Sequence, residues 1–319
     1  CLPVITAVMA FANLFGMGGA PLCSIERGRG NQKEAEAIMG NAFILMVICG
    51  VLLTILGIVF RRPLLYLFGA SDATYPYAES YMTIYLLGSV FVMMGLGMNA
   101  FINSQGFGRI GMLTVFLGAV ANIILDPIFI FACHMGVRGA ALATIISQAC
   151  SCIWVLSFLF GTRSTLRIKK QNLTLKAPVI LPCLALGLSL FIMQASESII
   201  SVCFNSSLLK YGGDVAVGAM TILTSVMQFA MLPLQGLGQG AQPMMSYNYG
   251  AKNTDRVKGT FFLLLKASLT YSVILWGLVM LFPQVFAGIF TSNPALVIFT
   301  KKALRVYMAV MFMFGIQIS

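Results

Sequence analysis

The sequence has 319 residues, of which 59% are hydrophobic and only 9% charged, and its formal net charge is +11. A mean hydropathy of +0.92 is too high for a soluble domain that buries a single apolar core, so a water-soluble protein is excluded. The excess of Lys and Arg does not indicate nucleic-acid binding, because these residues lie in short segments between apolar runs.

Runs without Asp, Glu, Lys or Arg follow one another along the chain, and each has roughly the 20 residues that a helix needs to cross a bilayer. In chain order they are 1–25, 37–60, 80–108, 139–162, 177–196, 215–251 and 267–300. Two more candidates are 110–133, which contains only Asp126, and 306–319, giving nine predicted helices. No run alternates with period two, which disfavours a β-barrel. The predicted fold class is all-α, a polytopic membrane helix bundle.

The basic residues divide unevenly between the two ends of these helices. Counted over alternate loops, twelve Lys and Arg residues lie on one side and seven on the other. The positive-inside rule therefore places the loops 26–36, 105–110, 162–177 and 247–258 in the cytoplasm.

An internal repeat relates the two halves of the chain at an offset of 222 residues. The first copy has Gly16, Gly18, Pro21, Ser24, Gly28 and Asn31, and the second has Gly238, Gly240, Pro243, Ser246, Gly250 and Asn253. The same offset pairs Phe68 with Phe290 and Tyr85 with Tyr307. Isolated matches arise from glycines and prolines at helix ends, but a shared register over more than sixty residues favours duplication.

The repeat predicts two lobes of six helices each. It gives an N-terminal lobe, a cytoplasmic linker and a C-terminal lobe at 1–161, 162–177 and 178–319. One helix of the second half and two of the first have no counterpart at this offset. We therefore expect a complete protein of twelve spans, truncated here at both ends, and no export by the truncated chain alone.

Several motifs resemble the multidrug and toxic compound extrusion transporters. They are Gly16 to Asn31, Pro233 to Pro243, Asn248 to Ala251, Asn122 to Pro127 and Gly139 to Thr144. The resemblance implies a secondary active antiporter in the inner (plasma) membrane rather than an enzyme. Such a protein exports amphipathic and cationic compounds in exchange for Na⁺ or H⁺ by alternating access.

Asn122 and Asp126 are the first candidates for cation coupling, because they lie four residues apart on one face of an otherwise uncharged span. Thr144 lies at the same predicted depth, since both it and Asp126 are nine residues from Met135 at the centre of a helical hairpin. Such a set of oxygens suits Na⁺ or a proton. In the resembling family the matching Asn, Asp and Thr form the cation site. Alternatively, Asp126 caps backbone groups that Pro127 leaves free.

Glu197 is a second coupling candidate, as an acid inside the span at 178–209, or else a neutral hydrogen-bonding residue. Amide side chains predict a substrate-binding cleft between the lobes, unless they only join helices to one another. These are Asn13, Gln235, Gln228, Gln239 and Gln242.

No cofactor is predicted other than a bound Na⁺. The eight cysteines have no metal-ligand spacing, His134 lies in a loop, and the Gly-Met-Gly sequence at 16–18 has no nucleotide-binding context. The predicted partners are small amphipathic or cationic substrates, Na⁺ or H⁺, and the lipid bilayer, with no nucleic acid and a monomeric state.

Three other function classes remain open at this point. A flippase for lipid-linked oligosaccharide could share the two-lobe architecture but would need several cations in its cleft. An intramembrane enzyme would need a catalytic pair at the same depth. A receptor or structural subunit would need no titratable group inside either lobe.

Overall fold

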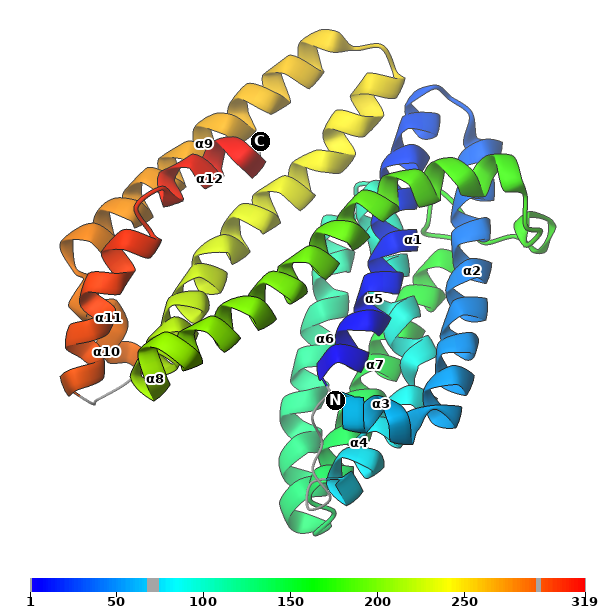
Figure 1. The fold of residues 1–319 in the computed structure, drawn as a ribbon. Coiled ribbons are helices and arrows are strands. Elements are labelled where there is room, and N and C mark those ends of the chain that lie inside the picture. Colours follow the sequence, from blue (N-terminus) through cyan, green and yellow to red (C-terminus); the bar gives the residue numbers. More distant parts are fainter. Residues whose placement is uncertain (1, 68–74, 291–293, 319) are drawn as a thin grey trace. The chain divides into compact units, whose positions relative to one another are not determined.

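The computed structural model describes residues 2–67, 75–290 and 294–318 (Figure 1). These residues contain helices and no strand, which confirms the all-α fold class. The α-helices are α1 (Leu2–Gly28), α2 (Gln32–Val59), α3 (Arg61–Leu67), α4 (Tyr75–Leu87), α5 (Ser89–Ser104), α6 (Gly108–Pro127), α7 (Val137–Phe160), α8 (Ala177–Gly250), α9 (Thr254–Leu281), α10 (Pro283–Phe290), α11 (Pro294–Tyr307) and α12 (Phe314–Ile318). A π-helix follows α6 at Ile128–Ala132, and 3₁₀ turns lie at Lys170–Asn172 and Met311–Met313.

Within the described residues, six helices are long and apolar enough to cross a membrane. They are Val4–Gly28, Gln32–Val59, Gly108–Ala132, Val137–Phe160, Gly218–Gly250 and Thr254–Leu281. Helices α4 and α5 meet at a bend of 53° and pass the same test together, so they form either a broken seventh span or a re-entrant loop. The chain is therefore a polytopic membrane protein, as its composition predicts.

Two spans differ in course from their predictions. The span predicted at 267–300 is wrong, because α9 begins at Thr254 and ends at Leu281. The charge-free criterion excluded the start of α9, where Lys258 and Lys266 can reach the aqueous interface along their flexible stems. Pro283 lacks a backbone N–H and begins a separate helix, α10.

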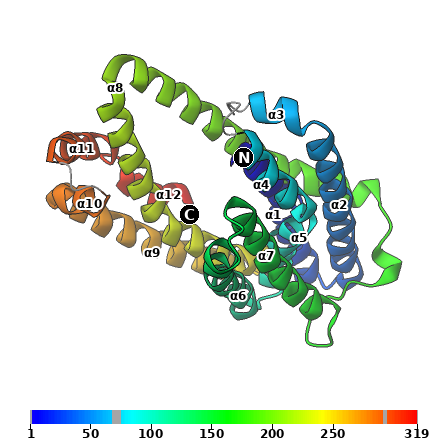
Figure 2. The same ribbon diagram turned by 90° about the horizontal axis from the view of Figure 1, so that it is seen from below.

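Two more predicted spans fall within one helical segment, and the second difference lies at the end of the chain. The spans predicted at 178–209 and 215–251 both belong to α8, whose ribbon reverses direction within residues 195–248 (Figures 1 and 2), and Gly218–Gly250 is by itself long and apolar enough to cross a membrane. The span predicted at 306–319 is divided among the end of α11, a 3₁₀ turn and α12.

The chain divides into two compact units. Unit 1 comprises Cys1–Gln194 and Tyr249–Lys252, and unit 2 comprises Ala195–Asn248 and Asn253–Ser319. Helix α8 contributes to both. The lobe boundaries at 161 and 178 stay a prediction.

The duplication is visible in the helix boundaries. Helices α2 and α9 begin 222 residues apart and end 222 residues apart. Asn31 caps α2 by accepting a hydrogen bond from Glu34 N at 3.4 Å, and Asn253 caps α9 from Arg256 N at 3.3 Å. The residue before each cap has a positive φ, 79° at Gly30 and 57° at Lys252. The same left-handed turn and the same cap therefore start the equivalent helix in both copies.

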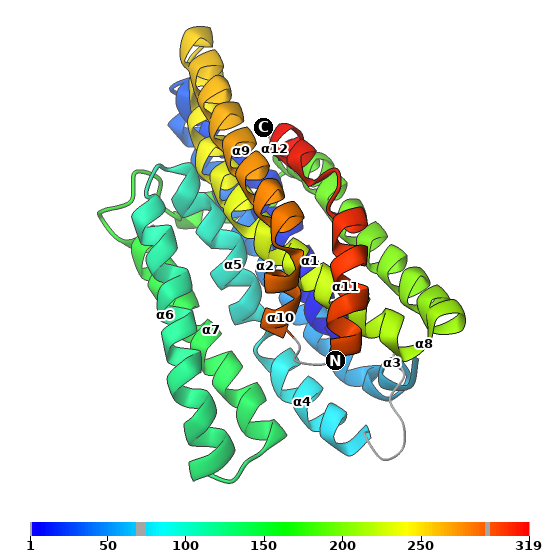
Figure 3. The ribbon, with the colours of Figure 1, turned by 90° about the vertical axis from the view of Figure 1, so that its left-hand side faces the viewer.

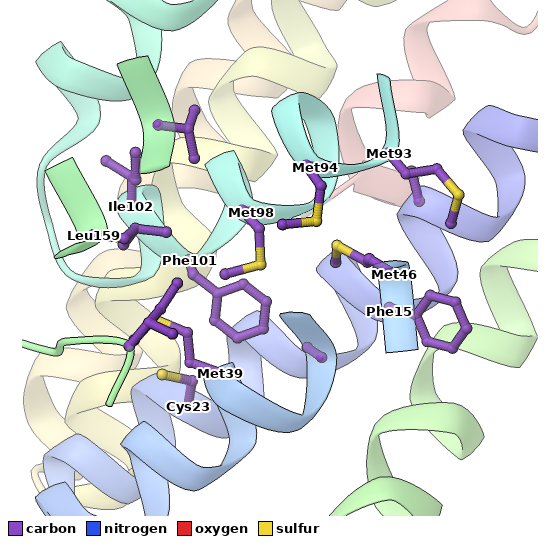
Figure 4. Close-up of a cluster of buried hydrophobic side chains, with 14 of the residues drawn as sticks. Phe15, Cys23, Met39, Met46, Met93, Met94, Met98, Phe101, Ile102 and Leu159 are labelled. Carbon is purple, nitrogen blue, oxygen red and sulfur yellow. The ribbon is translucent and has the colours of Figure 1, made fainter. Parts of the chain in front are cut away.

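The core of unit 1 is rich in methionine and lies among α1, α2, α5 and α7. Figure 4 shows Met39 and Met46 of α2 near Met93, Met98 and Phe101 of α5. All five side chains are buried. Flexible thioethers fill irregular gaps between helices, so these methionines stabilise packing rather than contact substrate.

The 162–177 segment is docked on the end of unit 1 rather than free. Gln105 Oε1 accepts hydrogen bonds from Ser164 Oγ at 2.8 Å and from the backbone N of Leu166 at 3.0 Å. Lys169 Nζ lies 2.7 Å from Glu36 Oε2, and the Glu36 side chain is only 5% exposed. The predicted linker is therefore a strap held to α2 and α5.

We expect Lys169→Met to loosen this strap, because it leaves the buried Glu36 carboxylate without its ammonium partner. The cost is about 1 kcal/mol after allowing for solvent around Lys169, or roughly a fivefold rise in local opening. Limited trypsin digestion after Arg163 and Arg167 measures that rise. Lys176→Met removes the same charge from the same segment, away from Glu36, and should leave the cleavage rate at the parent value. Equal rates for both variants would contradict the docking role of Glu36.

Candidate functional site

A cavity of about 250 Å³, lined by both apolar and uncharged polar residues, lies within unit 1 among α5, α6 and α7. Its lining residues are Gly95, Leu96, Asn99, Thr114, Val115, Gly118, Ala119, Asn122, Thr144, Ser147, Gln148 and Ser151. None of them is charged, and seven carry a hydroxyl or a side-chain amide. The cavity therefore offers hydrogen bonds without a fixed charge of its own.

Glycines on two helices admit the polar side chains of α7 to this cavity. A Cβ atom on Gly118 would lie 2.5 Å from Ser151 Oγ, which is too close for any side chain. A Cβ atom on Gly95 would lie 3.6 Å from Gln148 Oε1, at ordinary contact distance. The absence of a side chain on α6 at residue 118 thus makes room for the Ser151 hydroxyl.

The hydroxyls and the amides of the cavity differ in how far their hydrogen bonds are satisfied. Ser151 Oγ donates to the Thr114 carbonyl at 3.1 Å, and Thr144 Oγ1 donates to the Ala140 carbonyl at 2.9 Å. In contrast, Asn99 Oδ1 and Asn122 Nδ2 are buried without a hydrogen-bond partner among the described residues. An unpaired buried amide group costs free energy, so these two amides are ready to bind a ligand.

Asp126 lies one turn beyond Asn122, at the end of α6. Its Oδ1 atom is buried and has no hydrogen-bond partner in the part of the chain that the structure describes. Pro127 ends the helix, and the π-helix begins at the next residue. Oδ1 therefore caps no backbone group. Cation coupling by Asp126, and capping through its other oxygen, both stay predictions.

Helix α6, which carries Asp126, packs against α7, which carries Thr144, and the two helices lie side by side in Figure 3. Asn122 and Thr144 both line the cavity, whereas Asp126 does not. Tyr81 on α4 has both the Thr144 hydroxyl and the Asp126 carboxylate among its electrostatic neighbours. The common depth of Asp126 and Thr144 stays a prediction.

The remaining predicted site residues lie elsewhere. Asn13 is half-buried on α1 in unit 1. Four exposed glutamines lie on α8 in unit 2, namely Gln228, Gln235, Gln239 and Gln242. Because they are spaced by seven, four and three residues, they share one helical face. The cleft between the lobes stays a prediction. Glu197 falls within α8, but its side chain lies outside the described residues.

Three residues of the site escaped the sequence analysis. Asn99 and Gln148 line the cavity, and Tyr81 lies beside Asp126 and Thr144. Asn99 and Gln148 are amides inside charge-free runs, a signal that marks a buried polar group. That they face one cavity depends on how α5 packs against α7.

Comparison with known proteins gives one consistent result. The family model described as MatE matches residues 1–128 and 189–319. The chain is 25% identical over 315 residues to the multidrug export protein MepA of Staphylococcus haemolyticus, covering 99% of this chain and 69% of that protein. MepA of Staphylococcus aureus strain NCTC 8325 is 24% identical over the same length and coverage.

Solved structures agree with this match. The MATE multidrug transporter DinF-BH superposes with a TM-score of 0.90 at 35% identity, covering 99% of this chain and 71% of that chain. A MOP superfamily transporter from Pyrococcus furiosus superposes with a TM-score of 0.87 at 23% identity, covering 99% and 73%. The second likeness shows a shared fold.

Proposed function

The chain belongs to the MatE family of multi-pass membrane transporters, and from that premise we propose that it exports small amphipathic or cationic compounds in exchange for Na⁺ or H⁺. It is a transporter and not an enzyme. We propose in addition that exchange proceeds by alternating access.

The observation that carries the proposal is the unpartnered Oδ1 atom of Asp126 inside a membrane-spanning hairpin. A carboxylate in such a place is costly unless a cation or a proton neutralises it. Asn122 and Thr144 can add an amide oxygen and a hydroxyl oxygen, which are hard ligands that suit Na⁺. A bound Na⁺ would supply the neutralising charge, and a proton on Asp126 would do the same.

Coupling requires that the ion and the exported compound bias the same equilibrium. Asn122 and Thr144 both line the cavity. Asn122 also lies one helical turn before Asp126, and Thr144 shares Tyr81 with Asp126 as an electrostatic neighbour. Neutralisation of Asp126 would therefore change the hydrogen bonding of groups that face the compound. This shared pair is the physical route for exchange.

The cavity also favours the proposed cargo over a lipid-linked oligosaccharide. A pyrophosphate headgroup requires several cationic side chains. None of the twelve lining residues is charged, and apolar surface from Leu96, Val115 and Ala119 lies beside the amides. Such a lining suits a flat organic compound with few polar groups.

Gradient-driven transport in proteoliposomes tests the proposal. The complete protein is reconstituted in vesicles that contain a fluorescent organic cation such as ethidium, and Na⁺ or H⁺ gradients are imposed separately. We expect one gradient to accelerate ethidium movement, and we expect the acceleration to vanish when monensin or nigericin collapses that gradient. Ethidium movement that ignores both gradients would exclude exchange, and no movement at all would exclude export of this class of compound.

A further inference from the structure

Unit 2 contains a second cavity, of about 280 Å³, between α10 and α11. Three of its lining residues are cationic, namely Lys301, Lys302 and Arg305, and Gln284 of α10 adds a side-chain amide. Lys301 and Arg305 are four residues apart and share one face of α11. The cavity therefore gathers three positive charges from a single helix.

These charges have no acidic partner among the described side chains. The three ion pairs found in that part of the chain all lie in unit 1, at Glu26, Glu79 and Glu36. Asp255 is the last acid in the sequence and lies in the first turn of α9, far from its other end. The Asp214 side chain lies outside the described residues.

The equivalent position in the first copy of the repeat carries the opposite charge and forms an ion pair. Glu79 is the counterpart of Lys301 at the 222-residue offset, and Arg61 Nε lies 2.9 Å from Glu79 Oε1. The first copy thus neutralises this position internally, whereas the second presents only cations. The positive-inside rule places this end of unit 2 outside, so the bias of basic residues toward the cytoplasm does not account for these cations.

Apolar surface adjoins the cations. Ile289 on α10 and Ile298 and Val306 on α11 are 69%, 63% and 80% exposed. In a membrane protein such side chains face acyl chains. A ligand that fits both features has an anionic head and apolar tails.

We propose that Lys301, Lys302, Arg305 and Gln284 bind the phosphate group of an anionic phospholipid in the outer leaflet. The Arg305 guanidinium can form two parallel hydrogen bonds to phosphate oxygens, and the lysines add charge. Basic pockets next to membrane helices bind lipid headgroups in this way. The acyl chains lie along α10 and α11.

Native mass spectrometry of the full chain, released from mixed phosphatidylcholine and phosphatidylglycerol, tests the proposal. We expect one phosphatidylglycerol to be retained in preference to phosphatidylcholine. Changing Lys301, Lys302 and Arg305 to Gln should weaken that retention at least tenfold. Changing Arg256, Lys258 and Lys266 of α9 to Gln removes the same charge elsewhere in unit 2 and should leave it within twofold.

A charge-conserving variant and competition by free phosphate compounds extend the experiment. Arg305→Lys preserves the charge and removes the planar fork, so a several-fold weaker retention is expected even if the triple variant does not fold. Glycerol 1-phosphate and inorganic phosphate at millimolar concentration should not displace the lipid. Equal retention of both lipids, equal loss in both triple variants, or displacement by free phosphate would overturn the lipid site.

Discussion

Asp126→Asn is expected to abolish gradient-driven efflux, with a rate at least a hundredfold below that of the parent. The substitution keeps the size of the side chain and removes the charge that a Na⁺ or a proton would neutralise. Oδ1 of Asp126 has no hydrogen-bond partner among the described residues, so the change breaks no hydrogen bond at that atom. The loss should therefore be of coupling and not of folding.

The measurement combines two readouts on one preparation. Efflux of ethidium under an imposed gradient reports coupling, and fluorescence polarisation of ethidium in detergent reports binding. Asp126→Asn should lose gradient-driven efflux and should retain its ethidium affinity within about threefold. Asp255→Asn, at an acid in the first turn of α9, should retain both. Unchanged gradient-driven efflux in Asp126→Asn would sink the coupling role and turn attention to Glu197.

Thr144→Val separates the two candidate ions. A Na⁺ site loses a hydroxyl oxygen ligand, so the Na⁺ concentration for half-maximal efflux should rise about tenfold or more. A proton on Asp126 needs no such ligand, so proton-driven efflux should fall by no more than about threefold. The Oγ1 atom donates to the Ala140 carbonyl within its own helix, a bond that valine can lose at about 1 kcal/mol.

Local sequence features predicted the parts of the molecule that depend on one helix or one repeat. The 222-residue offset, found from scattered Gly, Pro and Asn residues, reappears in the ends and caps of α2 and α9. The spacing of Asn122 and Asp126 placed them on one face because helical periodicity fixes that relation. Each inference needed only the geometry of a single element.

Features that depend on contacts between helices could not be predicted. The convergence of Asn99 and Gln148 on one cavity requires α5 to approach α7, and no local pattern specifies that approach. The wrong span at 267–300 has a related cause. The charge-free criterion treats Lys266 as aqueous, whereas its long stem lets it lie inside α9.

Gly187→Leu should destabilise unit 1 at the contact between α1 and α8. A Cβ atom on Gly187 would collide with the carbonyl oxygen of Leu14 and lie 2.8 Å from the carbonyl carbon. Gly18 faces the same contact, because its Cβ would lie 2.9 Å from Gly187 N. Backbone atoms in a packed membrane interface cannot move aside as the end of a flexible side chain can.

The expected loss is about 3 kcal/mol or more, seen as a fall of about 10 °C or more in the melting temperature of the full chain in detergent. Phe11 and Phe191, whose ring centroids are 5.4 Å apart, extend the same interface and leave little room to shift it.

Gly236→Leu supplies the matched control. Gly236 lies on the same helix, α8, and outside its own turn of helix no heavy atom lies within 4 Å of its added Cβ. Leucine there gains helix propensity of up to about 1 kcal/mol over glycine, so the melting temperature should hold or rise. The melting temperature of Gly187→Ala should lie between those of the parent and Gly187→Leu. If Gly187→Leu melts with the parent and with Gly236→Leu, then α1 and α8 do not approach through their backbones at this point.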